Sequence, residues 1–227
     1  MDTLCCMEES QPEIVYSDNH ILVASKPSGW LTQPDQSRTP SLEGFAKEWV
    51  KGEYNKPGEA FLHAVHRLDK PVSGLVLFAR TSKALSRLNE QSRNQEIERI
   101  YWAEVEGILA HREARLKHFL IHGEHRALVG KEGDREAKLA VLNYLVEQFN
   151  AHSTFVSIDL ETGRYHQIRA QFSAIGHPIV GDKRYGAKTD GHDAIHLHSW
   201  QIFFEHPVTH EELSFKVEPA FQRSGLR

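Results

Sequence analysis

The stretch HRLDKPVSGLVLFA, residues 66–79, decides the fold predicted for this chain of 227 residues. Its last five residues form a short apolar run after the turn-forming Pro71, Ser73 and Gly74, and this pattern predicts a buried β-strand. Asp69 comes just before the turn, so its carboxylate would lie on a loop held by a rigid strand, a common place for catalytic groups. An aspartate that only caps the turn fits the same pattern, and position alone favours that simpler interpretation.

The sequence on either side of this stretch alternates strands with a few helices. Apolar runs at 14–16 and 21–24 around a polar turn predict a short hairpin. Helices are predicted from a start at Thr39-Pro40, from a cap at Ser82 to about Arg93, and over about 166–175. Further strands are predicted at 100–107, near 137–147, at 155–160 and at 195–204. This order predicts an α+β fold with a mixed, mostly antiparallel central sheet flanked by helices.

The composition is that of an ordinary globular protein, with 40% hydrophobic residues, 26% charged residues and a mean hydropathy of −0.50. No run approaches the ~18 apolar residues that a membrane span needs, and the acidic N-terminus does not resemble a secretory signal. The adjacent Cys5 and Cys6 are the only cysteines, which favours a reducing compartment and gives no support to a cysteine-based metal site. We therefore expect a cytoplasmic protein without membrane contact, with a disordered acidic tail at 1–12 and a single folded domain at 13–227.

Charge is distributed unevenly along the chain. The formal net charge is −4, from 27 Lys and Arg against 31 Asp and Glu, which is not typical of a nucleic-acid-binding protein. Residues 1–18 contain five acids and no Lys or Arg, whereas residues 162–188 contain five bases and a single acid, Asp182. A basic face under an acidic average fits this distribution, but ordinary solvated charge is the simpler interpretation when charge is taken alone.

Four motifs, in order along the chain, resemble those of the RluA-type pseudouridine synthases. Residues 66–75 resemble the signature HRLDxxTSGLL, with Val72 where the family most often has Thr. Residues 21–29, ILVASKPSG, resemble the family's strand and NKPSG turn, and residues 99–107, RIYWAEVEG, resemble KxYxAxVxG. Residues 162–186 resemble TGRxHQIRxHxxxxGHPIxGDxxYG. The resemblance covers about residues 14–218, and four ordered motifs are far more specific than any one of them.

The resemblance implies a pseudouridine synthase catalytic domain with a basic cleft across its sheet. The implied reaction breaks the N1–C1′ bond of uridine, turns the base and rejoins it through C5, without a cofactor or a metal. Asp69 would be the catalytic carboxylate, and Arg169 would be the cation that keeps it ionised. The ring of Tyr101 would stack on the uracil, and its hydroxyl could serve proton removal from C5. Attack of Asp69 on the base and attack on the sugar both remain open.

The implied substrate is a stem-loop of tRNA, of large-subunit rRNA or of both, bound by a monomer with no obligate protein partner. No S4-like RNA-binding domain is expected, since only residues 1–13 precede the first predicted strand. The target uridine must leave its stack, and Arg67 is a candidate to fill the vacated space; a phosphate contact or an ion pair explains Arg67 equally well. The other candidate RNA contacts, for which solvated charge is the alternative, are Lys26, Arg99, Arg164, His166, Lys183 and Arg184.

Three other classes of function compete with this interpretation. A metal hydrolase is suggested by the histidines clustered near the C-terminus, which are His192, His196, His198, His206 and His210. No HExxH spacing accompanies them, and 196–207 resemble the family's structural strand LHAxxLxFxHP. A non-catalytic RNA-binding or chaperone module would not need Asp69, Tyr101 and Arg169 together. An enzyme acting on free nucleosides would leave the basic positions unused.

Overall fold

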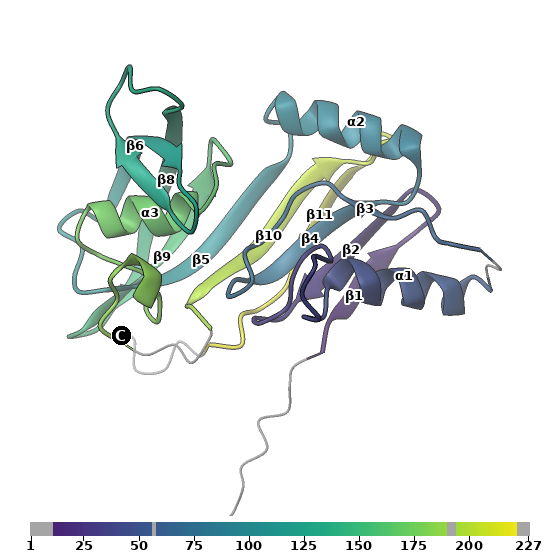
Figure 1. Ribbon diagram of the computed structural model, residues 1–227, viewed down its shortest axis with the longest axis horizontal. Coiled ribbons are helices and arrows are strands. Elements are labelled where there is room, and N and C mark those ends of the chain that lie inside the picture. The colour runs from purple at the N-terminus through teal and green to yellow at the C-terminus, as the bar shows by residue number, and fades with distance from the viewer. Residues whose placement is uncertain (1–10, 56–57, 190–193, 222–227) are drawn as a thin grey trace, which may run out of the picture.

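The computed structural model describes residues 11–55, 58–189 and 194–221. Figure 1 shows the chain as a broad sheet with helices packed on it. In chain order the elements are β1 (Glu13–Ser17), β2 (Ile21–Lys26), α1 (Leu42–Glu53), β3 (His63–Ala64), β4 (Ser73–Ala79), α2 (Ser82–Arg93), β5 (Glu98–Glu106), β6 (Glu113–His122), β7 (Ala127–Gly130), β8 (Lys138–Phe149), β9 (Ser153–Leu160), α3 (Gln167–Ala174), the 3-10 helix η1 (Lys183–Tyr185), β10 (Leu197–Glu205) and β11 (Glu212–Lys216).

The strands form one sheet of 11 strands in the main order β1-β2-β4-β10-β5-β9-β8-β6-β7, with β3 beside β4 and β11 beside β10. Pairing between its strands is antiparallel except between β4 and β10, which run parallel and pair Ser73 with His198 and Gly74 with Ser199. The prediction of an α+β fold with a mixed, mostly antiparallel sheet is therefore confirmed. The parallel pair joins strands that are far apart in the sequence and brings the start of β4 to the centre of the sheet.

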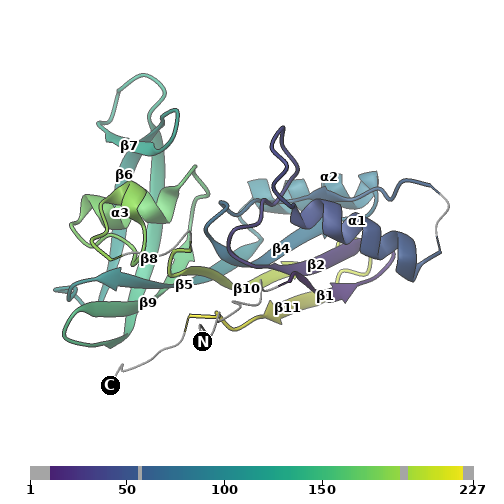
Figure 2. The same cartoon turned by 60° about the horizontal axis from the view of Figure 1, so that its bottom comes forward.

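The helices cover the sheet through alternate residues of its central strands. One hydrophobic cluster joins α1 and α3 to the side chains of Leu22 and Phe78, and a second joins α2 to their sequence neighbours Ile21 and Leu77. Because successive side chains of a strand point to opposite faces, α1 and α2 lie on opposite faces of β2 and β4. Figure 1 shows α3 at one end of the sheet and α1 at the other, and Figure 2 shows β6, β7 and β8 rising beside α3.

The helix starts differ slightly from those predicted. The cap of α1 is Ser41, whose hydroxyl accepts from Gly44 N at 3.2 Å, and not the expected Thr39-Pro40 start. The cap of α2 is Thr81, which accepts from Ala84 N at 3.1 Å, so Ser82 is already helical. In both cases the hydroxyl three residues before a free N–H group takes the capping position.

Some expectations concern residues outside the described ranges. The expected disordered tail falls largely on residues 1–10, and His192 of the histidine cluster falls within 190–193. Within the described ranges, no helix is long and apolar enough to cross a bilayer.

A substitution at Gly74 tests the junction between β4 and β10. Gly74 has a φ of 113°, and a Cβ there would lie 2.3 Å from Ser199 O. We expect Gly74→Ala to lower the free energy of unfolding by roughly 1–3 kcal/mol, because the backbone of β10 must move. Gly52→Ala is the matched control, since a Cβ at Gly52 in α1 meets nothing within 4 Å. Urea unfolding of both variants measures the difference, and equal stabilities would contradict the close approach described here.

Candidate active site

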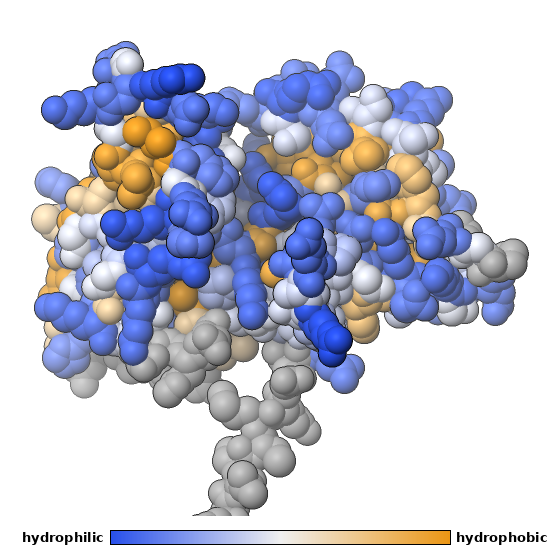
Figure 3. Space-filling view, viewed as in Figure 1, coloured by the Kyte–Doolittle hydropathy of each residue, from blue (hydrophilic) through white to orange (hydrophobic). Residues whose placement is uncertain are grey.

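Asp69 lines an open cleft of about 1510 Å³. The walls of the cleft come from residues 31–35 and 65–72 on one side, from 159–169 on the other, and from β5 between them. Figure 3 shows the surface hollowed between the half that carries α3 and the half that carries α1 and α2. The side chain of Asp69 is 27% exposed, so its carboxylate is partly buried and still reachable from the cleft.

Hydrogen bonds to the backbone fix the loop that carries Asp69. The Thr32 hydroxyl donates to Leu68 O at 2.8 Å and accepts from Leu68 N at 3.0 Å. On the other side of Asp69, the Ser28 hydroxyl donates to Pro71 O at 2.9 Å. Because the backbone on both sides is bonded, the carboxylate projects from a rigid loop.

Lys26 is fully buried, whereas it was expected to contact phosphate. Its Nζ donates to the carbonyl oxygens of Pro27, Trp30 and Lys70 at 2.9, 2.8 and 3.2 Å. Burial lowers the pKa of Lys26 to about 7, and the negative charge of Asp69 opposes this shift. Lys26 therefore ties the Lys-Pro-Ser-Gly turn to the loop of Asp69, and its ammonium is not presented to the cleft.

The carboxylate of Asp69 pairs with Arg169, which is 100 residues away in the sequence. Arg169 Nη1 donates to Asp69 Oδ2 at 3.0 Å, and His166 Nε2 lies 3.3 Å from the same oxygen. The turn is closed by Val72 N, which donates to Asp69 O at 3.0 Å. The expected proximity of Asp69 and Arg169 is present, and the interpretation of the Asp69 side chain as a simple turn cap is wrong.

Arg169 is a buried cation shared by two carboxylates. Its Nε and Nη2 donate to the two oxygens of Asp182 at 2.7 and 2.9 Å, and both side chains are almost fully buried. Burial disfavours the guanidinium charge, but hydrogen bonds to Asp182 and the charges of Asp182 and Asp69 raise the pKa of Arg169 above its usual range. The single positive charge of Arg169 thus pairs with two carboxylates. The group has a net negative charge, and of the two carboxylates Asp69 is the one that is partly exposed.

His166 is also buried and lies between Asp69 and Tyr185. The Tyr185 hydroxyl accepts from Ala127 N at 2.7 Å and lies 2.9 Å from His166 Nδ1. Burial, followed by the charge of Arg169, lowers the pKa of His166 to about 3, so the ring is neutral. Arg169 Nη1 lies 3.1 Å from His166 Nε2, and because a guanidinium can only donate, Nε2 accepts this bond and the ring proton is on Nδ1, where it donates to the Tyr185 hydroxyl. His166 therefore helps to hold the Arg169 guanidinium beside Asp69, and it is too enclosed for its expected phosphate contact.

Tyr101 comes from β5, where it pairs with Ser199 on β10 and Ile158 on β9. Its side chain is largely buried and lines the same cleft as Asp69. Burial raises the pKa of the Tyr101 hydroxyl, and the charge of Asp69 raises it further, although Arg99 opposes the shift. The hydroxyl therefore stays protonated near neutral pH, and Tyr101 offers a ring and a neutral O–H group to a ligand.

Three of the expected RNA contacts present basic side chains to the cleft, namely Arg67, Arg99 and Arg164. Arg67 is exposed and has no hydrogen-bond or ion-pair partner in the described part of the chain. Arg164 is exposed as well, and its Nε donates to Leu139 O at 2.9 Å. The Arg99 guanidinium packs over Gly163, where a Cβ would lie 3.3 Å from Arg99 Nη2.

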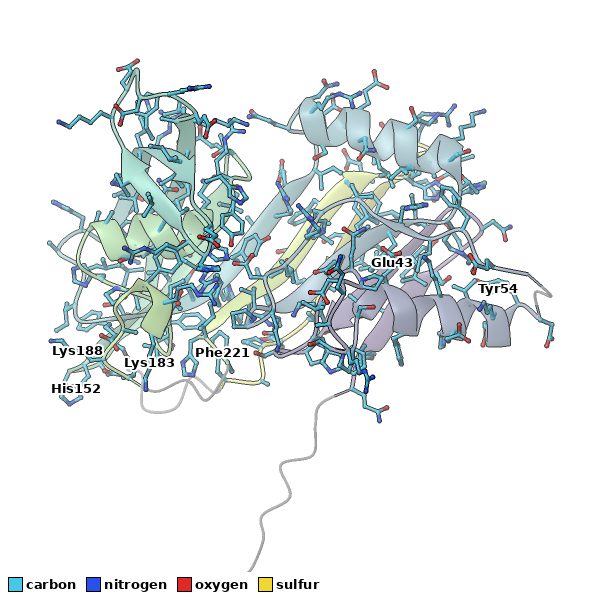
Figure 4. The ribbon with its side chains drawn as sticks, viewed as in Figure 1. Glu43, Tyr54, His152, Lys183, Lys188 and Phe221 are labelled. Carbon is cyan, nitrogen blue, oxygen red and sulfur yellow. The ribbon has the colours of Figure 1, made fainter. Side chains whose placement is uncertain are left out.

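Lys183 and Arg184 lie on η1 and do not line this cleft. Figure 4 shows Lys183 at the lower end of the half that carries α3. Arg184 Nη1 donates to His125 O at 3.0 Å. These two residues do not form the phosphate-binding wall of the cleft that the sequence suggested.

The cleft carries charges of both signs. Its six basic side chains are Arg67, Lys70, Arg93, Arg99, Arg164 and Arg169. Its five acidic side chains are Asp35, Asp69, Glu98, Asp159 and Glu161. The cleft across the sheet is therefore present, but it is less basic than expected, because acidic side chains nearly balance the basic ones. In addition, the buried Asp182 pairs with Arg169.

The histidines suggested as metal ligands have other partners. His196 Nδ1 lies 2.6 Å from Glu104 Oε2, and His198 Nδ1 lies 2.8 Å from Ser73 Oγ. His198 Nε2 is 2.8 Å from Val217 O. Across residues 11–55, 58–189 and 194–221, no three His, Cys, Asp or Glu side chains are arranged to hold a metal ion.

Sequence reasoning missed three residues that build the site: Asp182, Tyr185 and Thr32. Asp182 is the single acid among the five bases at 162–188, and that isolation was a usable signal for a buried partner of a cation. Tyr185 lies in the motif at residues 162–186 that resembles the family. Thr32 lies outside the four motifs, and only the fold brings it to Leu68.

A partly exposed carboxylate held by a buried guanidinium, beside a tyrosine in a wide cleft, is an arrangement typical of an enzyme active site. Residues 20–174 match the family model described as RNA pseudouridylate synthase. The chain is 36% identical over 213 residues to the "Dual-specificity RNA pseudouridine synthase RluA" of Pasteurella multocida, covering 92% of this chain and 94% of that protein. It is 34% identical over 219 residues to the "Ribosomal large subunit pseudouridine synthase C" of Escherichia coli, covering 90% and 65%.

The solved structure of "Human RNA Pseudouridylate Synthase Domain Containing 4" matches with a TM-score of 0.76 at 22% identity, covering 90% of this chain and 87% of that one. This likeness supports the fold. The chain belongs to the RNA pseudouridylate synthase family. The prediction of an isomerase of this type, made from four motifs, is confirmed.

A substitution at Lys26 tests its positioning role. We expect Lys26→Met to lower the free energy of unfolding by roughly 1–3 kcal/mol, because buried carbonyl oxygens lose their donor. Pseudouridine formation should fall as well, because the loop of Asp69 loses an anchor. Lys51→Met is the control, since Lys51 pairs with Glu48 on the exposed side of α1. A Lys26→Met variant with unchanged stability and activity would show that the buried ammonium holds nothing in place.

Proposed function

We propose that this chain isomerises specific uridines in structured RNA, with Asp69 as the reacting carboxylate, Arg169 as its charge partner and Tyr101 as the surface for uracil. The observation that carries the proposal is the 3.0 Å bond from Arg169 to Asp69 within an open cleft. A carboxylate serves as a nucleophile or as a stabiliser of positive charge only when it is ionised. The buried guanidinium favours that ionised form.

The reaction needs no change of oxidation state. The N1–C1′ bond breaks and a C5–C1′ bond forms, while C5 loses a proton and N1 gains one. Within the described residues, the contacts of the Asp69 carboxylate all go to Oδ2, which leaves Oδ1 for the substrate. This arrangement serves attack on the sugar and attack on the base equally, since both begin from the same oxygen.

Tyr101 supports the proposal through its position and its protonation. Its ring lines the cleft beside Asp69, where an extruded uracil can stack on it. Because its raised pKa keeps the hydroxyl neutral, Tyr101 acts in the resting site as a hydrogen-bond donor. Removal of the C5 proton by this hydroxyl therefore requires that its own proton pass to another group during the reaction.

The proposed substrate is a stem-loop of tRNA, of large-subunit rRNA or of both. The names of two relatives, a dual-specificity RNA pseudouridine synthase and a ribosomal large-subunit pseudouridine synthase, support RNA as the substrate class. Arg67 is exposed beside Asp69 and is proposed to fill the space of the extruded uridine or to bind its phosphate. Arg99 and Arg164 are proposed as further phosphate contacts.

We also propose that residues 13–227 work as one domain, that the protein is a monomer, and that it acts in the cytoplasm.

Replacement of Asp69 separates an enzyme from an RNA-binding module on the same scaffold. We expect Asp69→Asn to reduce the rate of pseudouridine formation by a factor on the order of 10⁴ or more, with RNA affinity retained. The assay maps pseudouridine in RNA from cells that lack the gene, after incubation with each protein. Glu212→Gln, on the exposed β11, is the control and should be as active as the parent protein. Unchanged modification by Asp69→Asn would refute the assigned role.

A further inference from the structure

Three aromatic rings are stacked along one wall of the cleft. His166 and Tyr165 are parallel with their centroids 3.9 Å apart, and Tyr165 and His122 are parallel with their centroids 4.1 Å apart. All three residues line the cleft that contains Asp69. The stack therefore begins at the catalytic carboxylate, which His166 contacts, and leads away from it.

The inner end of this stack is rigid. His166 lies edge-on against Tyr185, with centroids 5.6 Å apart, and its Nδ1 is 2.9 Å from the Tyr185 hydroxyl. Tyr185 in turn lies under the guanidinium of Arg169, 5.0 Å from its ring centre. The aromatic wall is thus built on the same buried group that holds Asp69, and its geometry is set before any ligand arrives.

The outer end of the stack is open. His122 is the last residue of β6, and its side chain is exposed, whereas Tyr165 in the middle is partly buried. One face of the His122 ring is covered by Tyr165. Within the described residues, its two ring nitrogens make no hydrogen bond or ion pair, and the ring has no second aromatic partner. A flat aromatic face that ends a preformed stack and borders a cleft is the kind of surface on which nucleobases stack.

We propose that His122, backed by Tyr165, binds an unpaired base that flanks the target uridine. This inference rests on the proposed function and extends it from the reacting nucleotide to a second one. The target uracil itself belongs beside Tyr101 and Asp69. The His122 face lies two ring spacings from His166, which suits a neighbouring nucleotide. Arg164, next to Tyr165 in the chain and exposed on the same wall, can hold the phosphate of that nucleotide.

The stack selects for a local shape of RNA. A base that remains paired in a helix has both faces covered by its neighbours and cannot lie on His122. An unpaired loop base can turn out and extend the aromatic stack. The platform therefore favours a target uridine in a loop or next to a bulge, and its preference for base identity is weak because every base has an aromatic face.

A coupling experiment between protein and RNA tests the proposal. The probe is a stem-loop RNA with the uridine in its loop, in which single abasic residues replace the loop bases one at a time. Equilibrium binding is measured in an Asp69→Asn background, so that no turnover alters the RNA. When the protein carries His122, we expect loss of the base at one loop position to weaken binding about tenfold. When the protein carries His122→Ala, loss of the same base should have almost no further effect on binding, because its stacking partner is already missing.

Two further variants separate stacking from structure. His122→Phe keeps a flat ring and should retain both the affinity and the abasic sensitivity. His125→Ala removes an exposed histidine three residues along, outside the cleft, and should leave binding unchanged. With Asp69 intact, His122→Ala should raise the RNA concentration for half-maximal rate while the rate at saturating RNA stays close to that of the parent protein.

Absence of coupling at every abasic position would overturn the platform, and so would a folded His122→Ala variant that binds as tightly as the parent protein. Failure of the proposed function is a different result: the parent protein would form no pseudouridine in any RNA. The binding experiment tests the aromatic stack whether or not the protein forms pseudouridine, because it does not depend on turnover.

Discussion

The site depends on one constraint, which is that the buried charge of Arg169 must be satisfied. A guanidinium removed from water is costly unless every donor finds a partner, and carboxylates are the best partners available. Asp182 binds two of its donor groups from within the fold, and Asp69 binds a third from the cleft. The same bonds that make the buried cation tolerable also fix where the carboxylate of Asp69 lies. The contacts that stabilise the buried cation therefore also position the carboxylate proposed to react.

The rest of the fold brings the two sides of this pair together. Asp69 comes from the half that carries α1, and Arg169 comes from α3 in the other half. The parallel pairing of β4 with β10 places the loop of Asp69 near β5, the strand of Tyr101. Thr32 and Lys26 then hold the loop by its backbone. A sheet that crosses the whole molecule thus acts as the frame on which residues distant in sequence meet.

The sequence predicted the parts of the molecule that local patterns and ordered motifs can specify. The buried strand after Asp69, the hairpin of β1 and β2, and the class of fold followed from apolar runs and turns. The resemblance implied Asp69, Tyr101 and Arg169 as the candidate catalytic residues, and the structure places Asp69 within bonding distance of Arg169. The strand predicted near 137–147 corresponds to β8, whereas β6 and β7 were not predicted, because β6 alternates exposed and partly buried positions without a continuous apolar run.

What sequence reasoning could not provide was the burial of charged and polar side chains. Lys26 and His166 were assigned to phosphate because they are basic residues in the matching motifs, yet both are enclosed. The three carbonyl oxygens around Lys26 come from two loops, and no pattern along the chain shows that they converge. The stack of His122 on Tyr165 joins residues from separate motifs and was equally invisible. The role of these side chains depends on which residues the fold packs around them, and the local sequence does not show this.

The claim that Arg169 serves Asp69, beyond stabilising the fold, is tested most directly by replacing the buried pair with apolar residues. Arg169→Met alone should be strongly destabilising, by about 3–5 kcal/mol, because Asp182 is left buried and unpaired. Adding Asp182→Leu removes that uncompensated charge and should restore most of the stability. The measurement is the rate of pseudouridine formation by the folded double variant Arg169→Met, Asp182→Leu. We expect pseudouridine formation to stay absent, since Asp69 has lost its cation. Formation at a rate near that of the parent protein would show that Arg169 serves only the stability of the fold.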